Sequence, residues 1–222
     1  MADLVDILDN NLNFENAKIA LIGPGSDLDD HSVFYYLNRI YGKNSKLLII
    51  DRKDCNPCTC GLGYFGRFQN LLNSFLEKTN LDLSKNLEYA SADAEILHNI
   101  IEEESFDIIS FRNVFSYLND SETSNSFKSA YKVLKNGGKL VVFARQNNSN
   151  YDLIKSWFNF LHDSKAYPIK EDYYKIKFEK EPIIPQFDSV FNDYSTPEYK
   201  KIDHAIIFKP KFSTDRLLIG IK

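Results

Sequence analysis

The sequence has 222 residues, 43% of them apolar and 26% charged, which is enough to bury one sizeable hydrophobic core. Its formal net charge of -4 does not favour binding to a nucleic-acid backbone or to an anionic membrane. The acidic start of the chain lacks the basic and apolar regions of a signal peptide, and no apolar run could cross a bilayer, so we expect a cytoplasmic protein.

Apolar runs and helical periodicity alternate along the first three quarters of the chain. The predicted strands cover residues 19–22, 46–50, 87–90, 106–110 and 139–144. The predicted helices cover residues 1–16 (a short helix or arm), a segment after Asp29 and Asp30 with Val33, Phe34, Leu37 and Ile40 on one face, then 68–78, 94–104, 121–135 and 151–163. Asn136-Gly137-Gly138 is interpreted as the glycine C-cap of the fifth of these helices and the turn into the next strand.

The last quarter of the chain has a different texture. Residues 165–203 are rich in Tyr, Lys, Pro and Phe with weak periodicity, and are interpreted as an insertion. Two strands, 204–208 and 216–221, are expected to pair as an antiparallel hairpin on the sheet edge. The whole chain, 1–222, is predicted to be a single α/β domain of the Rossmann-like, doubly wound type, with a mainly parallel sheet and an antiparallel last strand.

Glycines and acids follow the ends of successive predicted strands. Gly23 and Gly25 allow the backbone to approach a ligand that a Cβ would block. Asp51 ends the second strand, where a carboxylate could accept from the two hydroxyls of a ribose. Asp93 follows the third strand and is equally well explained as a ligand contact or as a helix N-cap. Because open parallel sheets bind ligands at the carboxyl ends of their strands, we expect a ligand site there.

These segments, in this order, resemble the class I S-adenosylmethionine-dependent methyltransferases. The matching pieces are Ile19-Ala-Leu-Ile-Gly-Pro-Gly25, Leu47-Leu-Ile-Ile-Asp51, Ala92-Asp93-Ala94, Phe106-Asp-Ile-Ile-Ser-Phe-Arg-Asn-Val114 and Leu134-Lys-Asn-Gly-Gly-Lys-Leu-Val-Val142. The resemblance covers residues 17–145 and, loosely, the last twenty residues. It implies a seven-stranded sheet, S-adenosylmethionine as cofactor, and transfer of its methyl group to an acceptor.

The resemblance also implies a cofactor-binding role for particular residues. Gly23, Pro24 and Gly25 would face the methionine part of the cofactor, Asp51 its ribose, and Asp93 the adenine amino group. The complete set is Gly23, Pro24, Gly25, Ser26, Asp27, Asp51, Arg52, Ala92, Asp93, Ala94, Arg112, Asn113 and Val114.

Two positions depart from the family pattern. Leu21 stands where the family usually has an acid, and Asp27 stands where it usually has a third glycine. Asp27 could instead accept from the cofactor's ammonium group or cap the following helix. The same lack of a third glycine disfavours an NAD-type oxidoreductase. A further alternative is a non-catalytic scaffold or regulatory protein that kept the fold.

Three cysteines, Cys55, Cys58 and Cys60, fall within six residues. A closed zinc site needs four ligands, and none of the four histidines stands at a telling spacing. The cluster could hold a metal, form a redox pair or bind a soft substrate such as arsenite, but reduced thiols in a loop are the favoured interpretation.

No motif in the sequence identifies the methyl acceptor. We expect a small molecule or a protein, bound by the aromatic-rich insertion at 165–203. No catalytic base is identified, and Arg112, His31 and Tyr117 are candidates by location alone.

Overall fold

The computed structural model describes residues 4–24, 31–52, 63–79, 82–112, 114–145, 149–169, 174–177, 199–202, 205–208 and 216–222. The helices are α1 (Leu4–Asn11), α2 (His31–Ile40), α3 (Gly63–Thr79), η1 (Ala94–Ile96), α4 (Leu97–Ile100), η2 (Val114–Tyr117), α5 (Asp120–Val133) and α6 (Tyr151–Phe158). The strands are β1 (Lys18–Ile22), β2 (Lys46–Asp51), β3 (Leu87–Ser91), β4 (Phe106–Arg112), β5 (Leu134–Ala144), β6 (His162–Pro168), β7 (Tyr174–Lys177), β8 (Tyr199–Ile202), β9 (Ala205–Phe208) and β10 (Arg216–Ile221).

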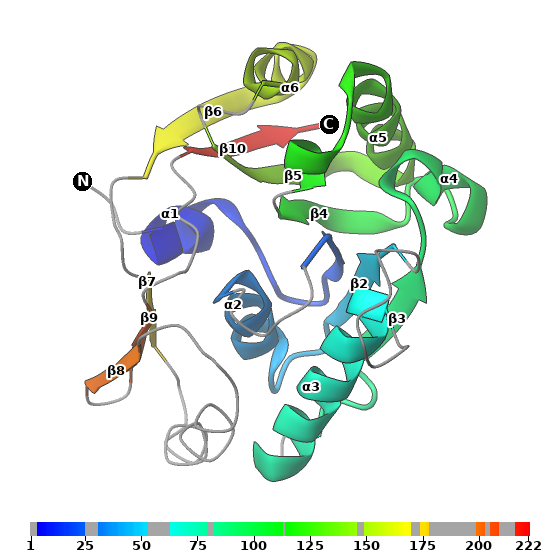
Figure 1. The fold of residues 1–222 in the computed structure, drawn as a ribbon. Coiled ribbons are helices and arrows are strands. Elements are labelled where there is room, and N and C mark those ends of the chain that lie inside the picture. The colour runs from blue at the N-terminus through cyan, green and yellow to red at the C-terminus, as the bar shows by residue number, and fades with distance from the viewer. Residues whose placement is uncertain are drawn as a thin grey trace.

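Seven strands form one twisted sheet in the order β3-β2-β1-β4-β5-β10-β6 (Figure 1). The strand β1 lies between β2 and β4 and pairs with both in parallel, with Leu21 opposite Ile49 and Ser110. The strand β10 is antiparallel to both of its neighbours, β5 and β6. This confirms the predicted doubly wound sheet with an antiparallel last strand. The strand order reverses between β1 and β4, which is where such sheets bind ligands.

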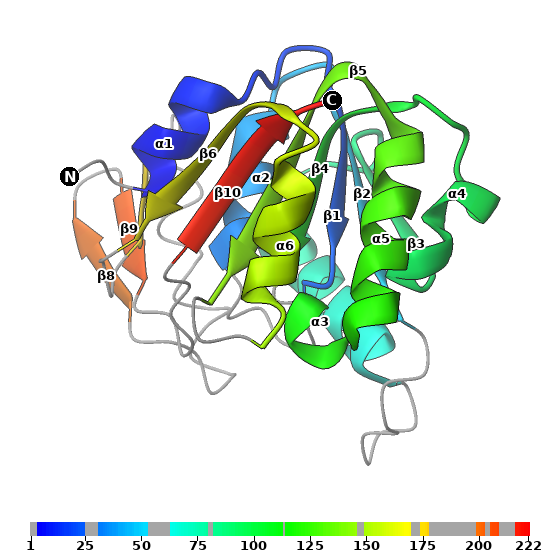
Figure 2. The same ribbon diagram turned by 90° about the horizontal axis from the view of Figure 1, so that it is seen from above.

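Helices cover both faces of the sheet, as Figure 2 shows from above. The apolar side chains of α1, α2 and α3 pack on one face, and those of α4, α5 and α6 pack on the other. Central strands buried on both faces need continuous apolar runs, which is why β1 reads Ile-Ala-Leu-Ile. Among the described residues, no helix has the length and apolarity needed to span a membrane.

The predicted C-terminal hairpin is wrong. The strand β9 pairs with β7 and β8 in a separate three-stranded antiparallel sheet, whereas β10 inserts between β5 and β6. The strand β6 was not predicted, and its residues 165–168 fall in the segment interpreted as an insertion. Six of its seven residues are exposed, because it is the edge strand, and it therefore lacks the alternating apolar pattern that marks a half-buried strand.

Several predicted helix boundaries also change. The helix α5 ends at Val133, and its C-cap is Leu134 in an extended conformation, so Asn136-Gly137-Gly138 lies inside β5 and does not cap the helix. Gly137 has φ +78° and donates its N–H to the carbonyl of Lys222 at 2.9 Å, so it links β5 to the residue that follows β10. The predicted helix 94–104 is only η1 and α4, and α3 begins at Gly63, earlier than predicted.

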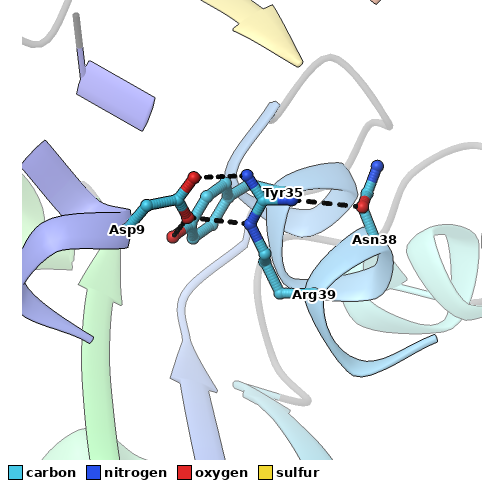
Figure 3. Close-up of polar contacts among 4 residues, drawn as sticks. All are labelled: Asp9, Tyr35, Asn38 and Arg39. Atoms are coloured by element: carbon cyan, nitrogen blue, oxygen red, sulfur yellow. Dashed lines mark hydrogen bonds and ion pairs between the residues drawn. The ribbon is translucent and has the colours of Figure 1, made fainter. Parts of the chain in front are cut away.

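A polar cluster ties α1 to α2 (Figure 3). Arg39 donates from Nε to Oδ1 of Asp9 at 2.8 Å and from Nη2 to Oδ2 at 2.5 Å. The hydroxyl of Tyr35 donates to Oδ1 of the same carboxylate at 2.8 Å. Burial, and then the charge of Asp9, raise the pKa of Tyr35 far above its ordinary value. Burial lowers the pKa of Arg39, but the ion pair with Asp9 more than offsets this, so that pKa is raised.

Candidate functional site

The turn after β1 packs against the end of β4. Gly23 has φ +72°, a left-handed conformation that favours glycine, and its N–H donates to the carbonyl of Ile50 at 2.9 Å. A Cβ on Gly23 would lie 2.3 Å from Cγ2 of Val114 and 3.1 Å from the carbonyl oxygen of Arg112. The glycine is therefore required by the close approach of two strand ends, and the structure brings Gly23, Arg112 and Val114 together.

Acidic residues lie at the ends of β2 and β3. The half-buried Asp51 accepts through Oδ1 from the backbone N–H of Arg52 at 2.8 Å. Arg52 forms an ion pair from Nε to Oδ1 of Asp93 at 2.7 Å, with both side chains about half exposed. The N–H of Ala92 donates to the carbonyl of Asp51 at 3.1 Å, which holds the two strand ends side by side.

Asp93 is the N-cap residue of η1, but its side chain makes no capping hydrogen bond. Asp93 therefore has the expected N-cap position, but its carboxylate pairs with Arg52 and does not cap η1. Ala94 is buried in the core beneath, while Ala92 is half-buried. Asp51, Arg52, Ala92 and Asp93 thus form a polar edge adjoining the Gly23 turn.

Arg112 ends β4 and is buried, with 3% of its surface exposed. Its guanidinium lies over the ring of Phe143, 5.3 Å from the centroid, in a cation–π contact. A guanidinium stays protonated at neutral pH, so Arg112 is not a base. Tyr117, another base candidate, is 83% exposed at the end of η2.

Leu21, at the family's usual acidic position, is fully buried in the core on the α2 side of the sheet. The surrounding side chains are apolar, so a leucine fits this position better than the acid that is usual in the family. Of the remaining predicted residues, Gly25, Ser26, Asp27, Asn113, Cys55, Cys58 and Cys60 lie outside the described residues. In the part of the chain that is described, no group of three or more side chains could hold a metal ion.

Sequence reasoning missed one buried polar residue that contacts the segment after β4. Asn150 is 4% exposed, and its side-chain amide donates to backbone carbonyls of the segment that follows β4. Nothing in the local sequence distinguishes it from the many other asparagines, because its partners are 27 to 35 residues away in the chain.

Part of the chain matches a known protein family. Residues 60–142, which include β3, β4 and most of β5, match a family model described as a methyltransferase domain. No curated protein matches the chain significantly.

Solved structures with the same fold include several methyltransferases. The YcgJ protein from Bacillus subtilis is 14% identical, with TM-score 0.53, over 98% of this chain and 97% of that one. A methyltransferase from Archaeoglobus fulgidus that depends on S-adenosylmethionine is 10% identical, with TM-score 0.50, over 99% and 93% of the two chains. An arsenic(III) S-adenosylmethionine methyltransferase from Chlamydomonas reinhardtii is 12% identical, with TM-score 0.51, over 96% and 66%.

The matched domain and its structural neighbours point to S-adenosylmethionine as the cofactor, and the strand ends carry groups that could hold it. Carboxylates at the ends of β2 and β3 are acceptors suited to ribose hydroxyls and to an adenine amino group. The glycine turn keeps the backbone of β1 close to β4 at the point where the strand order reverses. Residues 60–142 therefore match a methyltransferase domain, and the whole chain has the seven-stranded, Rossmann-like fold of methyltransferases of known structure.

Proposed function

We propose that this protein transfers the methyl group of S-adenosylmethionine to an acceptor, and that it binds the cofactor along the carboxyl ends of β1, β2, β3 and β4. Asp51 would accept from the ribose hydroxyls, and Asp93, flanked by Ala92 and Ala94, would face the adenine. Gly23, Pro24 and Gly25 would line the methionine end with Arg112, Asn113 and Val114. Ser26, Asp27 and Arg52 complete the proposed set.

One observation carries this proposal. Three contacts link neighbouring strand ends. Gly23 packs against Val114 between β1 and β4, and the N–H of Gly23 donates to Ile50 between β1 and β2. Arg52 pairs with Asp93 between β2 and β3. They join four neighbouring strand ends into one edge at the reversal of strand order. Ligands of open α/β sheets bind at such an edge.

The chemistry asks little of the protein beyond alignment. The cofactor supplies a methyl group on a sulfonium, and the acceptor displaces it in line, so holding the two reactants in register provides most of the rate. A base is needed only for an acceptor that carries its proton at neutral pH. Arg112 would contribute a fixed positive charge at the methionine end.

The acceptor is proposed to be a small molecule or a protein bound by the segment 165–203. Its strand β7 lies beside α1 and α2, on the sheet face where these helices pack (Figure 1). Together with β9 and β8 it forms a small sheet, which we propose lines one side of the acceptor site. The small sheet lies outside the seven-stranded sheet that carries the proposed cofactor edge.

Calorimetric titration with S-adenosylmethionine, S-adenosylhomocysteine and NAD tests the cofactor part. We expect micromolar binding of the first two ligands and none of NAD. Binding of NAD alone would support an oxidoreductase, and no binding of any of the three would support a non-catalytic scaffold.

Deletion of residues 170–200 tests the acceptor part. We expect the shortened protein to lose methyl transfer to acceptors that the full chain methylates, with its affinity for S-adenosylhomocysteine unchanged. Loss of cofactor binding together with acceptor turnover would contradict a separate acceptor role for this segment.

A further inference from the structure

The side chain of Asn150 holds the segment that follows β4. Asn150 precedes α6, yet its side chain makes no capping bond to that helix. Its Nδ2 instead donates to the carbonyl oxygen of Leu118 at 2.5 Å and to that of Phe115 at 3.2 Å. The hydroxyl of Thr123, in α5, lies 3.1 Å from the same nitrogen. One buried amide therefore joins the start of α6 to η2 and α5.

The bonded segment, η2, is the one that meets the glycine turn. Its first residue, Val114, has its Cγ2 2.3 Å from the position that a Cβ of Gly23 would take. Its second, Phe115, is buried and stacks on Phe127 at 4.7 Å between ring centroids. Asn150 fixes the other end of η2 through the carbonyls of Phe115 and Leu118.

Loss of this amide would remove a hydrogen-bond donor from the carbonyls of Phe115 and Leu118, which accept from it at a largely buried position. Buried backbone carbonyls need a partner, so the segment would move to find water or another donor. Because Phe115 is held by its ring, the movement would fall on the neighbouring backbone, which includes Val114 and its contact with Gly23.

We propose that Asn150 is a positioning residue, which fixes η2 so that Val114 and the Gly23 turn present the methionine end of the cofactor site in binding geometry. This inference rests on the proposed function, because it assigns η2 to the border of the cofactor site. Asn150 itself is not proposed to touch the cofactor.

Two variants test the proposal. Asn150→Ala removes the amide, and Asn150→Asp keeps the shape while an ionised carboxylate offers no donor to the carbonyls. We expect each variant to bind S-adenosylhomocysteine about tenfold more weakly than the wild type. The isosteric variant keeps the test decisive if the alanine variant does not fold.

Asn86 provides a matched control at the amino ends of the strands, away from the proposed cofactor site. Its Nδ2 donates to the carbonyls of Lys43 at 3.1 Å and Ser45 at 2.7 Å, just before β2 and β3 begin. We expect Asn86→Ala and Asn86→Asp to lose stability to urea but to bind S-adenosylhomocysteine within about twofold of the wild type, because these carbonyls are far from the carboxyl ends of the strands.

Hydrogen exchange of the backbone amides gives a readout that does not need the cofactor. We expect faster exchange across 114–118 in the Asn150 variants and not in the Asn86 variants. Equal cofactor affinity in wild type and Asn150 variants, equal weakening in both sets of variants, or unchanged exchange across 114–118 would overturn the inference. A wild-type protein that does not bind S-adenosylhomocysteine would overturn the proposed function, and exchange would then still decide whether Asn150 holds η2.

Discussion

Arg52 and Asp93 form an ion pair, with Nε of the guanidinium 2.7 Å from Oδ1 of the carboxylate, across the ends of β2 and β3. The pair joins the residue after Asp51 to the acid proposed to face the adenine. Both side chains are about half exposed, so the pair contributes little to stability but sets the direction of the Asp93 carboxylate.

The substitution Arg52→Ala therefore tests whether the ion pair orients the Asp93 carboxylate for binding without stabilising the fold. We expect the free energy of unfolding to change by about 0.5 kcal/mol or less, since solvent screens the pair. We expect the affinity for S-adenosylhomocysteine to fall about threefold, because a carboxylate without its partner loses its fixed direction. Calorimetry and urea unfolding measure the two quantities. Tighter binding would mean instead that Arg52 competes with the ligand for Asp93.

Asp51→Ala should weaken cofactor binding more strongly. Hydrogen bonds to a charged acceptor contribute about 1.5–3 kcal/mol, so the affinity for S-adenosylhomocysteine should fall about 10- to 100-fold. Asp107→Ala is the control. Its carboxylate accepts from the N–H of Lys18 and from Nζ of Lys135, both at 2.8 Å, at the amino ends of the strands and away from the proposed cofactor site. Equal losses in the two variants would count against the ribose assignment.

Gly23→Ala should destabilise the fold, and Gly42→Ala separates the two reasons. Both glycines have positive φ, +72° and +71°, which costs a non-glycine residue about 1–2 kcal/mol. A Cβ on Gly42 has nothing within 4 Å, whereas one on Gly23 meets Val114. We expect Gly23→Ala to cost about 1–3 kcal/mol more than Gly42→Ala in urea unfolding, followed by fluorescence of the single tryptophan.

A double-mutant cycle identifies the contact responsible for this difference. If the Cβ clashes with the side chain of Val114, Val114→Ala should recover part of the cost of Gly23→Ala. Additive effects of the two substitutions would show that Val114 is not the obstacle.

Tyr35→Phe should lower stability near neutral pH by about 1–2 kcal/mol, because Asp9 loses a hydrogen bond in a partly buried cluster. Burial raises the pKa of Tyr35, so the folded state keeps its phenolic proton after the unfolded chain has released it. The stabilisation is therefore present below about pH 10 and is lost as the pH rises further, by about 1.4 kcal/mol per pH unit. The gap between wild type and Tyr35→Phe should narrow above pH 10 in urea unfolding, and a constant gap would contradict the prediction.

The cysteine cluster is expected to consist of reduced thiols. Purified protein should then show three thiols that react with a chromogenic reagent, from Cys55, Cys58 and Cys60, and no stoichiometric zinc or iron in elemental analysis. A metal at one equivalent, released when the thiols are blocked, would support a metal site instead.

The sequence by itself determined the central strands, the glycine turn and the acids that follow β2 and β3. Strands buried on both faces must be apolar throughout, so β1, β2 and β4 are legible as short apolar runs. A left-handed turn needs glycine, and Gly23 has that conformation. Each of these features depends on neighbours only a few residues apart.

Tertiary structure alone decided the partners. The exposed edge strand β6 leaves no apolar pattern, and β10 pairs with β5 and β6, far from it in the chain, and not with the adjacent β9. The bonds from Arg52 to Asp93 and from Asn150 to Phe115 join residues 41 and 35 positions apart in the chain. Local periodicity records which face of an element is buried, but the identity of a distant partner is set only when the chain closes on itself.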